Sequence, residues 1–312
     1  MRSLKDIFKE ILQEICDEEN ISYKVLSKNW IIILEKNGKT RFIAGYRFGL
    51  NSHAVGEIVD DKYGLYEVLK ENNIPVIEHR IIYNKTNHLK YAIGCNSSEY
   101  VKEYFEKNNN HIVIKPNASA CGRGVCNITD VNQIDDFLEK LFLRHYSISM
   151  CPFYNIKHEY RAVVLNGKVE LLYAKYLPRV IGDGNKSIRQ LLIEFNNNYF
   201  KNRLNESIYD RILANNEIYE YNWKFNLSRG SISKEIEDAK LKEDLIIIAE
   251  KVSNVLDLKF GSIDIIQTEN DELMVLEVNS GVMMENYLLQ HPEEREKVKD
   301  IYKRAILSMF EN

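Results

Sequence analysis

The stretch GSIDIIQTENDELMVLEVN, residues 261–279, decides the fold of this chain. Two runs rich in apolar and β-branched residues flank the polar turn TENDE, a pattern that predicts an antiparallel hairpin. Centring the turn on residues 270–271 places Asp264 opposite Glu277. Asn279 then lies on the same face as Glu277, because the side chains of a strand alternate between its two faces.

The side chains of Asp264, Glu277 and Asn279 are therefore predicted to converge on one patch. Two carboxylates that face each other across a strand pair repel unless a cation lies between them. Mg²⁺ prefers oxygen ligands and commonly binds one or two carboxylates together with substrate phosphates. The patch therefore predicts a magnesium site, while the alternative is the solvent-exposed polar face of an edge hairpin. The apolar neighbours expected to face the core are Ile263, Ile265, Leu276 and Val278.

Two further hairpins are predicted where Asn-Gly pairs interrupt strand-like runs. They are WIIILEKNGKTRFIAG (30–45) and EYRAVVLNGKVELLYAK (159–175). Apolar residues at helical spacing predict an amphipathic helix near the start of the chain. Single helices separate the hairpins, which indicates an α+β protein with antiparallel sheets rather than a doubly wound parallel sheet. The other predicted helices cover residues 60–73, 98–107, 130–145, 187–196, 239–258 and 292–310, and the other extended segments are 74–82, a strand from 112, and 147–154.

A second informative stretch is IVIKPNASACGRGV, residues 112–125, in which an apolar strand ends in Lys115 and runs into a small-residue loop. The loop stops one glycine short of the dinucleotide fingerprint G-x-G-x-x-G. Small residues such as Gly122 and Gly124 nevertheless let backbone N–H groups approach phosphate closely. A lysine, an amide-rich loop and a magnesium patch are the parts of a phosphoryl-transfer site. Taken alone, Lys115 is more typical of an exposed strand end than of a phosphate site.

The segment GDGNKS, residues 182–187, resembles a Walker loop only superficially. Asn185 separates the glycine from the lysine, so the required G-x-x-x-x-G-K-[ST] pattern is not met. The segment is interpreted as a turn that leads into a helix. Ser187 at the N-cap and Gln190 three residues later form the expected capping box.

Composition restricts the functional class. A formal net charge of −4 with dispersed basic residues argues against a nucleic-acid-binding surface. Five cysteines without CxxC spacing are interpreted as reduced thiols of a cytoplasmic protein. The sequence has no apolar run of membrane-spanning length and no apolar core of a signal peptide near its start, so neither a membrane partner nor secretion is expected.

Four segments, taken in order over residues 60–281, resemble the ATP-grasp superfamily of ATP-dependent carboxylate–amine ligases. The resemblance is closest to the ATP-grasp domains of cyanophycin synthetase, bifunctional glutathione synthetase and the ribosomal-protein glutamate ligases. It implies an α+β ATP-grasp fold in which two α+β lobes grip ATP, with a small N-terminal lobe at 1–59, a central and lid subdomain at 60–150 and a C-terminal subdomain with the metal site at 151–312. The segments are DDKYGLYEVLKENNIPV, IVIKPNASACGRGV, EYRAVVLNGKVELLYAKYLPRVIGDGNKSIRQLL and NLSRG…FGSIDII…VLEVNSG.

The resemblance also implies how the nucleotide is bound. Lys62 and Lys115 would contact the ATP phosphates, and the loop that carries Ser119, Gly122 and Gly124 would close over them. A hinge formed by Met150, Cys151 and Phe153 would bind adenine through backbone groups. Glu159 would hold the ribose hydroxyls, and Lys175 would lie near the adenine or the phosphates. A three-residue turn at NGK would place Lys175 opposite Glu159, and a two-residue turn would not.

The remaining implied roles concern the metal and the substrate. Asp264, Glu277 and Asn279 would hold Mg²⁺, with Mn²⁺ as a substitute. Catalysis is expected of Lys115, together with Arg229 and Asn226 near the acyl phosphate. Arg161 and Arg179 are candidates for gripping the substrate carboxylate, and for both the alternative is a surface salt bridge. Ser280 and Gly281 occupy the position of the family's Pro-Gly substrate turn.

The implied reaction joins a carboxylate to an amine as an amide, through an acyl phosphate, with ADP and phosphate as products. The expected substrates are amino acids or short peptides. Two alternatives stay open: modification of a ribosomal peptide or protein by terminal addition or macrocyclisation, and a non-catalytic ATP-binding module. A homodimer is expected by analogy only. The chain departs from the family pattern at Tyr63-Gly64 after Lys62, at the ASAC of the loop and at SGVMMENY after Asn279.

Overall fold

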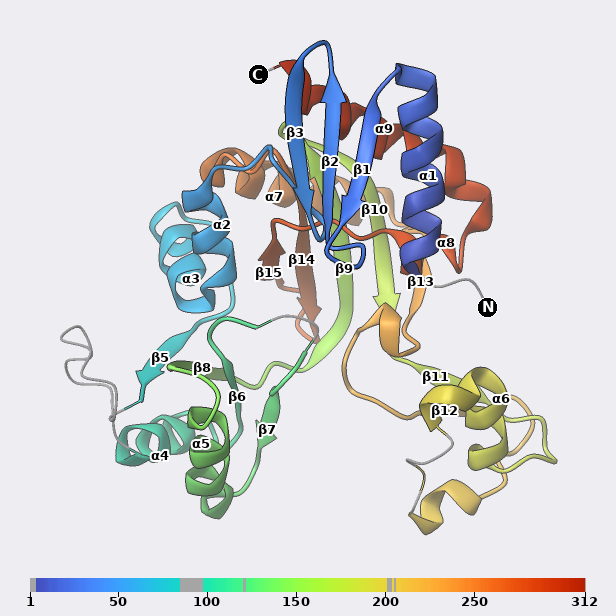
Figure 1. Ribbon diagram of the computed structural model, residues 1–312. Helices are drawn as coiled ribbons and strands as arrows, with labels where there is room; N and C mark the ends of the chain where they lie inside the picture. The colour runs from blue at the N-terminus through green and yellow to red at the C-terminus, as the bar shows by residue number, and fades with distance from the viewer. Residues whose placement is uncertain (1–3, 85–97, 120–121, 201–203, 205, 312) are drawn as a thin grey trace. The chain divides into compact units, whose positions relative to one another are not determined.

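The computed structural model describes residues 4–84, 98–119, 122–200, 204 and 206–311. The chain divides into two compact units, one formed by Met1–Ala174 with Glu235–Asn312 and the other by Lys175–Lys234 (Figure 1). Each unit is described by itself. The division at residues 59 and 150 that the resemblance implies stays a prediction.

The first unit begins with helix α1 (Leu4–Glu19), which precedes a sheet of β1 (Ser22–Leu26), β2 (Ile31–Lys36), β3 (Lys39–Ala44) and β4 (Arg47–Phe48) in chain order. The predicted hairpin at Asn37-Gly38 is confirmed, and both turn residues have positive φ, as a tight hairpin turn of this kind requires. Helices α2 (His53–Asp60) and α3 (Lys62–Glu71) follow. The single predicted helix over 60–73 therefore starts at Lys62, with Asp61 as its N-cap.

A second sheet has the strand order β5-β8-β6-β7, formed by Arg80–Tyr83, Ser147–Pro152, Ile112–Pro116 and Cys126–Ile128. Helices α4 (Ser98–Lys107) and α5 (Ile134–Phe142) bury one face of this sheet against a shared apolar core (Figure 1). The predicted helix over 130–145 is shorter than expected. It is preceded by a 3₁₀ turn at Val131–Gln133, because the carboxylate of Asp130 accepts a hydrogen bond from the amide of Asn132.

The central sheet of this unit has β10 (Lys168–Tyr176), β9 (Ile156–Leu165), β14 (Phe260–Thr268) and β15 (Leu273–Asn279) side by side. Helix α7 (Ala239–Leu256) packs on β9 and β14. The short helix α8 (Glu285–Leu288) and a 3₁₀ turn at Pro292–Glu294 lead into the last helix, α9 (Arg295–Glu311). Antiparallel hairpins thus form the centre of the unit, which confirms the predicted α+β class.

The register predicted for the deciding hairpin is confirmed at its far end, where Asp264 pairs with Glu277. Closer to the turn the prediction is wrong by one residue, since Ile265 pairs with Val275. Leu276 is therefore the extra residue of a β-bulge, and its side chain is only partly buried instead of lying in the core. Beyond the bulge the strands return to the predicted register. Asp264 and Glu277 therefore lie opposite each other, as the prediction of the metal site requires.

The second unit contains β11 (Arg179–Ile181), α6 (Ile188–Phe200), β12 (Ile218–Glu220) and β13 (Ile232–Lys234), with 3₁₀ turns at Ser207–Asp210 and Leu227–Arg229. The interpretation of GDGNKS as a turn before a capped helix is confirmed. Asp183 accepts hydrogen bonds from the amides of Asn185 and Lys186. The amide of Ser187 bonds Gln190 Oε1 at 2.8 Å, and the amide of Gln190 bonds Ser187 Oγ at 3.3 Å, which is the predicted capping box.

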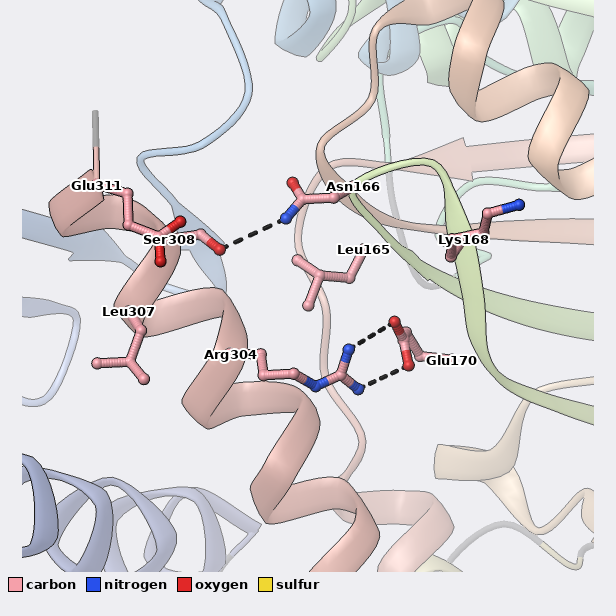
Figure 2. A pocket seen from close by; sticks show the side chains of 8 residues that line it. All are labelled: Leu165, Asn166, Lys168, Glu170, Arg304, Leu307, Ser308 and Glu311. Atoms are coloured by element: carbon pink, nitrogen blue, oxygen red, sulfur yellow. Dashed lines mark hydrogen bonds and ion pairs between the residues drawn. The ribbon is translucent and has the colours of Figure 1, made fainter.

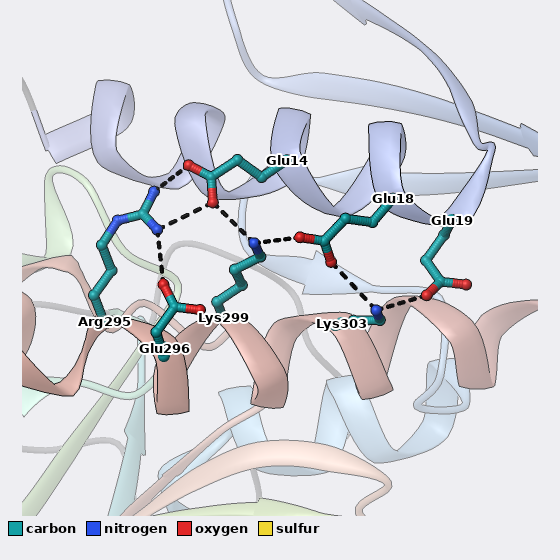
Figure 3. A network of polar contacts seen from close by, with 7 residues as sticks. All are labelled: Glu14, Glu18, Glu19, Arg295, Glu296, Lys299 and Lys303. Atoms are coloured by element: carbon teal, nitrogen blue, oxygen red, sulfur yellow. Dashed lines mark hydrogen bonds and ion pairs between the residues drawn. The ribbon is translucent and has the colours of Figure 1, made fainter.

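Helices α1 and α9 are joined by a network of ion pairs (Figure 3). Arg295 contacts Glu14 through both of its terminal nitrogens, and Lys299 bridges Glu14 and Glu18. Hydrogen bonds from Arg295 and Lys299 lower the pKa of Glu14 to about 2. The network fixes the first helix of the chain against the last one.

Replacing Arg295 with alanine is expected to lower the free energy of unfolding at pH 7 by about 1 kcal/mol, a value discounted because both partners are partly exposed. Because the folded pKa of Glu14 lies below the ordinary value of 4.5, its contribution is present above pH 4.5 and is lost as the pH falls towards 2. The difference between wild type and Arg295→Ala should therefore shrink at pH 3 in urea denaturation. Lys240→Ala, which removes an exposed pair within α7, should change stability less. An equal difference at both pH values would contradict the assignment.

Candidate active site

Lys115 is the residue before the end of strand β6, on the face of the second sheet that α4 and α5 do not cover. Its neighbour in the adjacent strand is Ser149, and the next row on this face pairs Val113 with Cys151. The intervening residues, such as Met150, point into the helix-covered core. Lys115 is only 7% exposed, so its interpretation as an exposed strand end is wrong.

Lys62 reaches the same region from the first turn of α3. Its ammonium donates to the backbone oxygens of Ser119 at 2.8 Å and Asn117 at 3.3 Å. The Asn117 side chain accepts a 3.1 Å hydrogen bond from the amide of Tyr63. These bonds tie the loop after β6 to the start of α3. Asn117, which is buried, was not identified from the sequence, although it directly follows the Lys-Pro pair.

The two lysines bring two buried positive charges close together. Burial lowers the pKa of Lys62, the nearby Glu277 carboxylate raises it, and Lys115 lowers it further. In the part of the chain that the structure describes, no carboxylate lies within ion-pairing distance of either ammonium. Buried charges are normally paired, so this arrangement suits a ligand that carries several negative charges, such as a polyphosphate.

An apolar cluster adjoins the lysines on the same face of the sheet. Val113 and Cys151 pack there with Ile77 of the preceding segment and Ile266 of β14. The ring of Phe153 stacks on that of His111, with centroids 3.8 Å apart. An apolar region beside a cationic one matches the base and the phosphates of a nucleotide. The partly buried members of the cluster are Val125, Phe153, Tyr154, Ile156, Met274 and Leu276.

Two glycines of the loop that follows Lys115 have backbone conformations that other residues rarely adopt. Gly122 and Gly124 have φ values of 64° and 69°, which favour glycine. A Cβ atom on Gly124 would also lie 2.9 Å from Pro116 Cγ. Ser119 Oγ donates to the backbone oxygen of Arg123 at 3.1 Å. The ASAC departure falls on Ala118 to Cys121, and residues 120 and 121 lie outside the described residues.

Asp264, Glu277 and Arg161 lie in one row across three neighbouring strands. Asp264 in β14 pairs with Glu277 in β15 on one side and with Arg161 in β9 on the other. Arg161 donates from Nε and Nη2 to the two Asp264 oxygens at 2.8 and 2.7 Å. Asn279 is the partner of Ser262 in the next row. Arg161, a candidate for the substrate carboxylate, is thus engaged with a proposed metal ligand.

The donor set fits Mg²⁺ bound together with phosphate oxygens. Among the described residues no cluster of three or more His, Cys, Asp or Glu side chains could hold a metal. Two carboxylates and the Asn279 amide would have to be completed by oxygens of the substrate, which is how Mg²⁺ is commonly held. The nearby Lys62 would contact the same phosphates.

Two further predicted nucleotide ligands lie on the central sheet. Glu159 of β9 is buried opposite Ile266. The hairpin turn between β9 and β10 consists of Asn166 and Gly167 alone, so the three-residue turn that would place Lys175 opposite Glu159 is absent. Lys175 is buried near the end of β10. The ribose and adenine roles of these residues stay predictions.

The predicted substrate turn packs against the N-terminal sheet, a contact that the sequence did not indicate. The amide of Val282 donates to the backbone oxygen of Tyr46 at 3.1 Å. A Cβ atom on Gly281 would lie 3.5 Å from the Arg47 side chain. Ser280 is buried, and its hydroxyl has no hydrogen-bond partner within the described residues. The first sheet therefore forms part of the wall beside Ser280 and Gly281.

A buried acid lies behind this turn. Glu285 is completely buried and accepts a 2.5 Å hydrogen bond from the Tyr46 hydroxyl. Burial raises the pKa of Glu285 to about 7, although the hydrogen bond from Tyr46 opposes this. The hydroxyl of Tyr302 in α9 accepts from the amide of Met284 at 3.1 Å. The segment after Asn279 is thus held from both sides.

The remaining predicted residues belong to the second unit. Arg179 lies in β11 opposite Glu220 of β12. Asn226 caps the turn that contains Arg229 by accepting a 2.9 Å hydrogen bond from the amide of Ser228. Gly230 follows with a φ of 100°. Asn226 therefore has a local structural role, and the catalytic roles of Asn226 and Arg229 and the substrate role of Arg179 stay predictions.

A cavity of about 340 Å³ lies elsewhere, beside the β9–β10 turn and α9 (Figure 2). Arg304 and Glu170 form a bidentate pair in its wall, at 2.7 and 2.6 Å. None of the predicted site residues lines it. We therefore place the candidate site at the lysines and the hairpin. The residues lining the cavity are Leu165, Asn166, Lys168, Glu170, Arg304, Leu307, Ser308 and Glu311.

The sequence of the chain is similar to those of several known proteins. Residues 185–291 match the RimK-like ATP-grasp domain family. The glutathione biosynthesis bifunctional protein of Streptococcus mutans is 24% identical over 195 residues, covering 61% of this chain and 24% of that protein. The corresponding protein of Listeria innocua is 26% identical over 215 residues, covering 61% of this chain and 28% of that protein. The chain spans about a quarter of the length of these relatives.

Solved structures share the fold. D-alanine–D-alanine ligase from Bacillus anthracis superposes with a TM-score of 0.55 at 15% identity, over 84% of this chain and 72% of that one. A bifunctional glutathione synthetase from Pasteurella multocida superposes with a TM-score of 0.53 at 16% identity, over 91% of this chain and 43% of that one. Within the described residues, no helix is long and apolar enough to cross a membrane. The chain has the ATP-grasp fold, and residues 185–291 are similar in sequence to RimK-like ATP-grasp domains.

Proposed function

We propose that this chain is an ATP-dependent ligase that joins a carboxylate to an amine as an amide. The observation that carries the proposal is the buried pair Lys62 and Lys115, next to the hairpin of Asp264 and Glu277. Among the described residues no carboxylate lies within ion-pairing distance of either ammonium, although Glu277 is near enough to raise the pKa of Lys62. The hairpin supplies oxygen ligands on the same side. This combination suits ATP bound with Mg²⁺ better than a neutral or cationic ligand.

In the proposed reaction the substrate carboxylate attacks the γ-phosphate of ATP, and ADP leaves. An amine then attacks the resulting acyl phosphate, and the amide forms with loss of phosphate and a proton. Lys62 and Lys115 would stabilise the charge that develops on the phosphate oxygens. The loop of Ser119, Gly122 and Gly124 would direct amides at the phosphates and exclude water. Mg²⁺, held by Asp264, Glu277 and Asn279, would polarise the phosphoryl oxygens. No protein nucleophile is needed.

The proposal extends to the surroundings of the reaction. The substrates would be amino acids or short peptides, with Ser280, Gly281 and the arginines Arg161 and Arg179 near the carboxylate. Arg229 and Asn226 would lie near the acyl phosphate. The enzyme would work in the cytoplasm, as a homodimer by analogy with its superfamily. The relatives that carry names of amide-forming ligases support this chemistry without identifying the substrate.

The second candidate is modification of a ribosomal peptide or protein. SGVMMENY, which stands in place of the family's usual Pro-Gly turn, falls on the acceptor side, and a larger exposed groove beside it would favour this candidate. The third candidate, a non-catalytic ATP-binding module, is less favoured, since a protein that only binds ATP has less need of Asp264, Glu277 and Asn279 together.

Incubation with ATP, Mg²⁺ and a panel of amino acids and dipeptides should release ADP with at least one carboxylate substrate. Hydroxylamine should trap the acyl phosphate as a hydroxamate, which is detected by mass spectrometry. The matched control omits the carboxylate and should release little ADP. A protein that binds ATP but yields neither ADP nor hydroxamate, with free amino acids or with peptides, would support the non-catalytic alternative.

A further inference from the structure

His79 is a buried imidazole next to the two lysines, and the proposed reaction does not use it. It is 2% exposed and lies one residue before β5. Its Nδ1 is 2.6 Å from Ser149 Oγ, and the ring of Tyr66 in α3 meets it edge-on, with centroids 6.5 Å apart. A histidine in this position needs a physical reason, because burying a polar ring costs free energy unless its nitrogen atoms form hydrogen bonds.

The hydrogen bond connects His79 to the strand that carries Lys115. Ser149 is fully buried in β8, the strand between β5 and β6. It is the direct neighbour of Lys115 on one side and of Ile81 on the other. His79 therefore holds the side chain that lies beside Lys115, and an apolar residue in its place would leave the Ser149 hydroxyl buried without this partner.

The charge of His79 is set by the same surroundings. Burial lowers the pKa of His79 well below its ordinary value, and the positive charges of Lys115 and Lys62 lower it further. The groups that face it are Lys115 from β6, Lys62 and Tyr66 from α3 and Ser149 from β8. The imidazole is therefore neutral near pH 7. A carboxylate here would instead pair with the lysines and compete with any bound phosphate.

We propose that His79 is a positioning residue for the nucleotide phosphates: it bonds Ser149 beside Lys115 and keeps the region under both ammonium groups polar but uncharged. The lysine charges then stay available to an anionic ligand. This inference rests on the proposed function, since it assumes that Lys62 and Lys115 bind phosphate.

The test compares His79→Asn with His79→Asp, two variants of nearly equal size that differ in charge. The probe is the non-hydrolysable ATP analogue AMP-PNP with Mg²⁺, titrated by calorimetry at pH 7.5, and thermal unfolding is followed in parallel without nucleotide. His79→Asn should bind within about threefold of wild type, because its amide can still bond Ser149. His79→Asp should bind at least about tenfold more weakly, because its carboxylate is attracted to the lysines. Without nucleotide His79→Asp should unfold at a higher temperature than His79→Asn.

Two further variants separate positioning from general packing. His79→Leu should weaken binding by about tenfold, comparable to the loss of one hydrogen bond to a buried group. Tyr104→Phe, which removes a buried hydroxyl without a described partner from the helix-covered core, should leave binding unchanged. Equal affinities of the Asp and Asn variants, or wild-type affinity of His79→Leu, would overturn the inference while leaving the proposed function intact. A wild-type protein that does not bind the analogue at all would contradict the proposed function itself.

Discussion

Replacing Lys115 with alanine is expected to weaken binding of Mg²⁺–AMP-PNP by roughly 100-fold, the loss of one charge-assisted hydrogen bond at a buried site. The ammonium lies in a region of low exposure, where its attraction for phosphate is much stronger than at the surface. The same change should leave the unliganded protein as stable as wild type or more stable, because it removes a buried charge that has no carboxylate partner among the described residues. Affinity and stability should thus change in opposite directions.

Calorimetric titration of the analogue measures the first effect, and thermal unfolding measures the second. Lys107→Ala is the matched control, because it removes the same charge from an exposed position at the end of α4. Its affinity and its unfolding temperature should stay close to those of wild type. A folded Lys115→Ala protein with wild-type affinity would show that the loop of residues 112–125 is not a phosphate site.

The hairpin of residues 261–279 shows which features of the fold can be predicted from local sequence and which cannot. Alternation and turn composition predicted two strands and placed Asp264 opposite Glu277, which is confirmed. They did not predict the bulge at Leu276, because a bulge depends on how both strands pack against other elements. Leu276 consequently contributes to the apolar cluster beside Lys115 instead of the central core. The pairing of Asp264 with Arg161 was also missed, since β9 and β14 are not consecutive along the chain.

Residues whose contacts are far away in sequence could not be identified from the sequence for the same reason. Asn117 meets Tyr63, His79 meets Ser149 and Tyr46 meets Glu285, and in each case the partners lie far apart in sequence. A lone polar residue has no periodicity, so only the fold reveals that it is buried and bonded. Glu277 could be identified from the register of the hairpin and Lys115 from its position between an apolar strand and a small-residue loop, and the resemblance of both segments to a known family supported them. The small-residue loop alone matched no phosphate fingerprint.

Replacing Glu277 with glutamine is expected to reduce the rate of ADP release by about 1,000-fold at low Mg²⁺, since a lost metal ligand removes several kcal/mol of charge stabilisation. The substitution keeps the size of the side chain and its position opposite Asp264. It also removes the charge that raises the pKa of Lys62, so Lys62 should lose its proton more easily. Asp264→Asn is a less selective test, because it also leaves the Arg161 guanidinium without its bidentate partner.

The decisive measurement is the Mg²⁺ dependence of ADP release at saturating ATP. If Glu277 holds the metal, the Glu277→Gln variant needs a higher Mg²⁺ concentration for half-maximal rate, and excess Mg²⁺ restores part of the activity. If Glu277 acts only by stabilising the charge of Lys62, the rate falls but the Mg²⁺ dependence does not move. Glu272→Gln, an exposed acid near the turn of the same hairpin, controls for the loss of one negative charge and should behave as wild type. An unchanged Mg²⁺ dependence in Glu277→Gln would therefore remove Glu277 from the metal site while leaving Lys115 as the phosphate ligand.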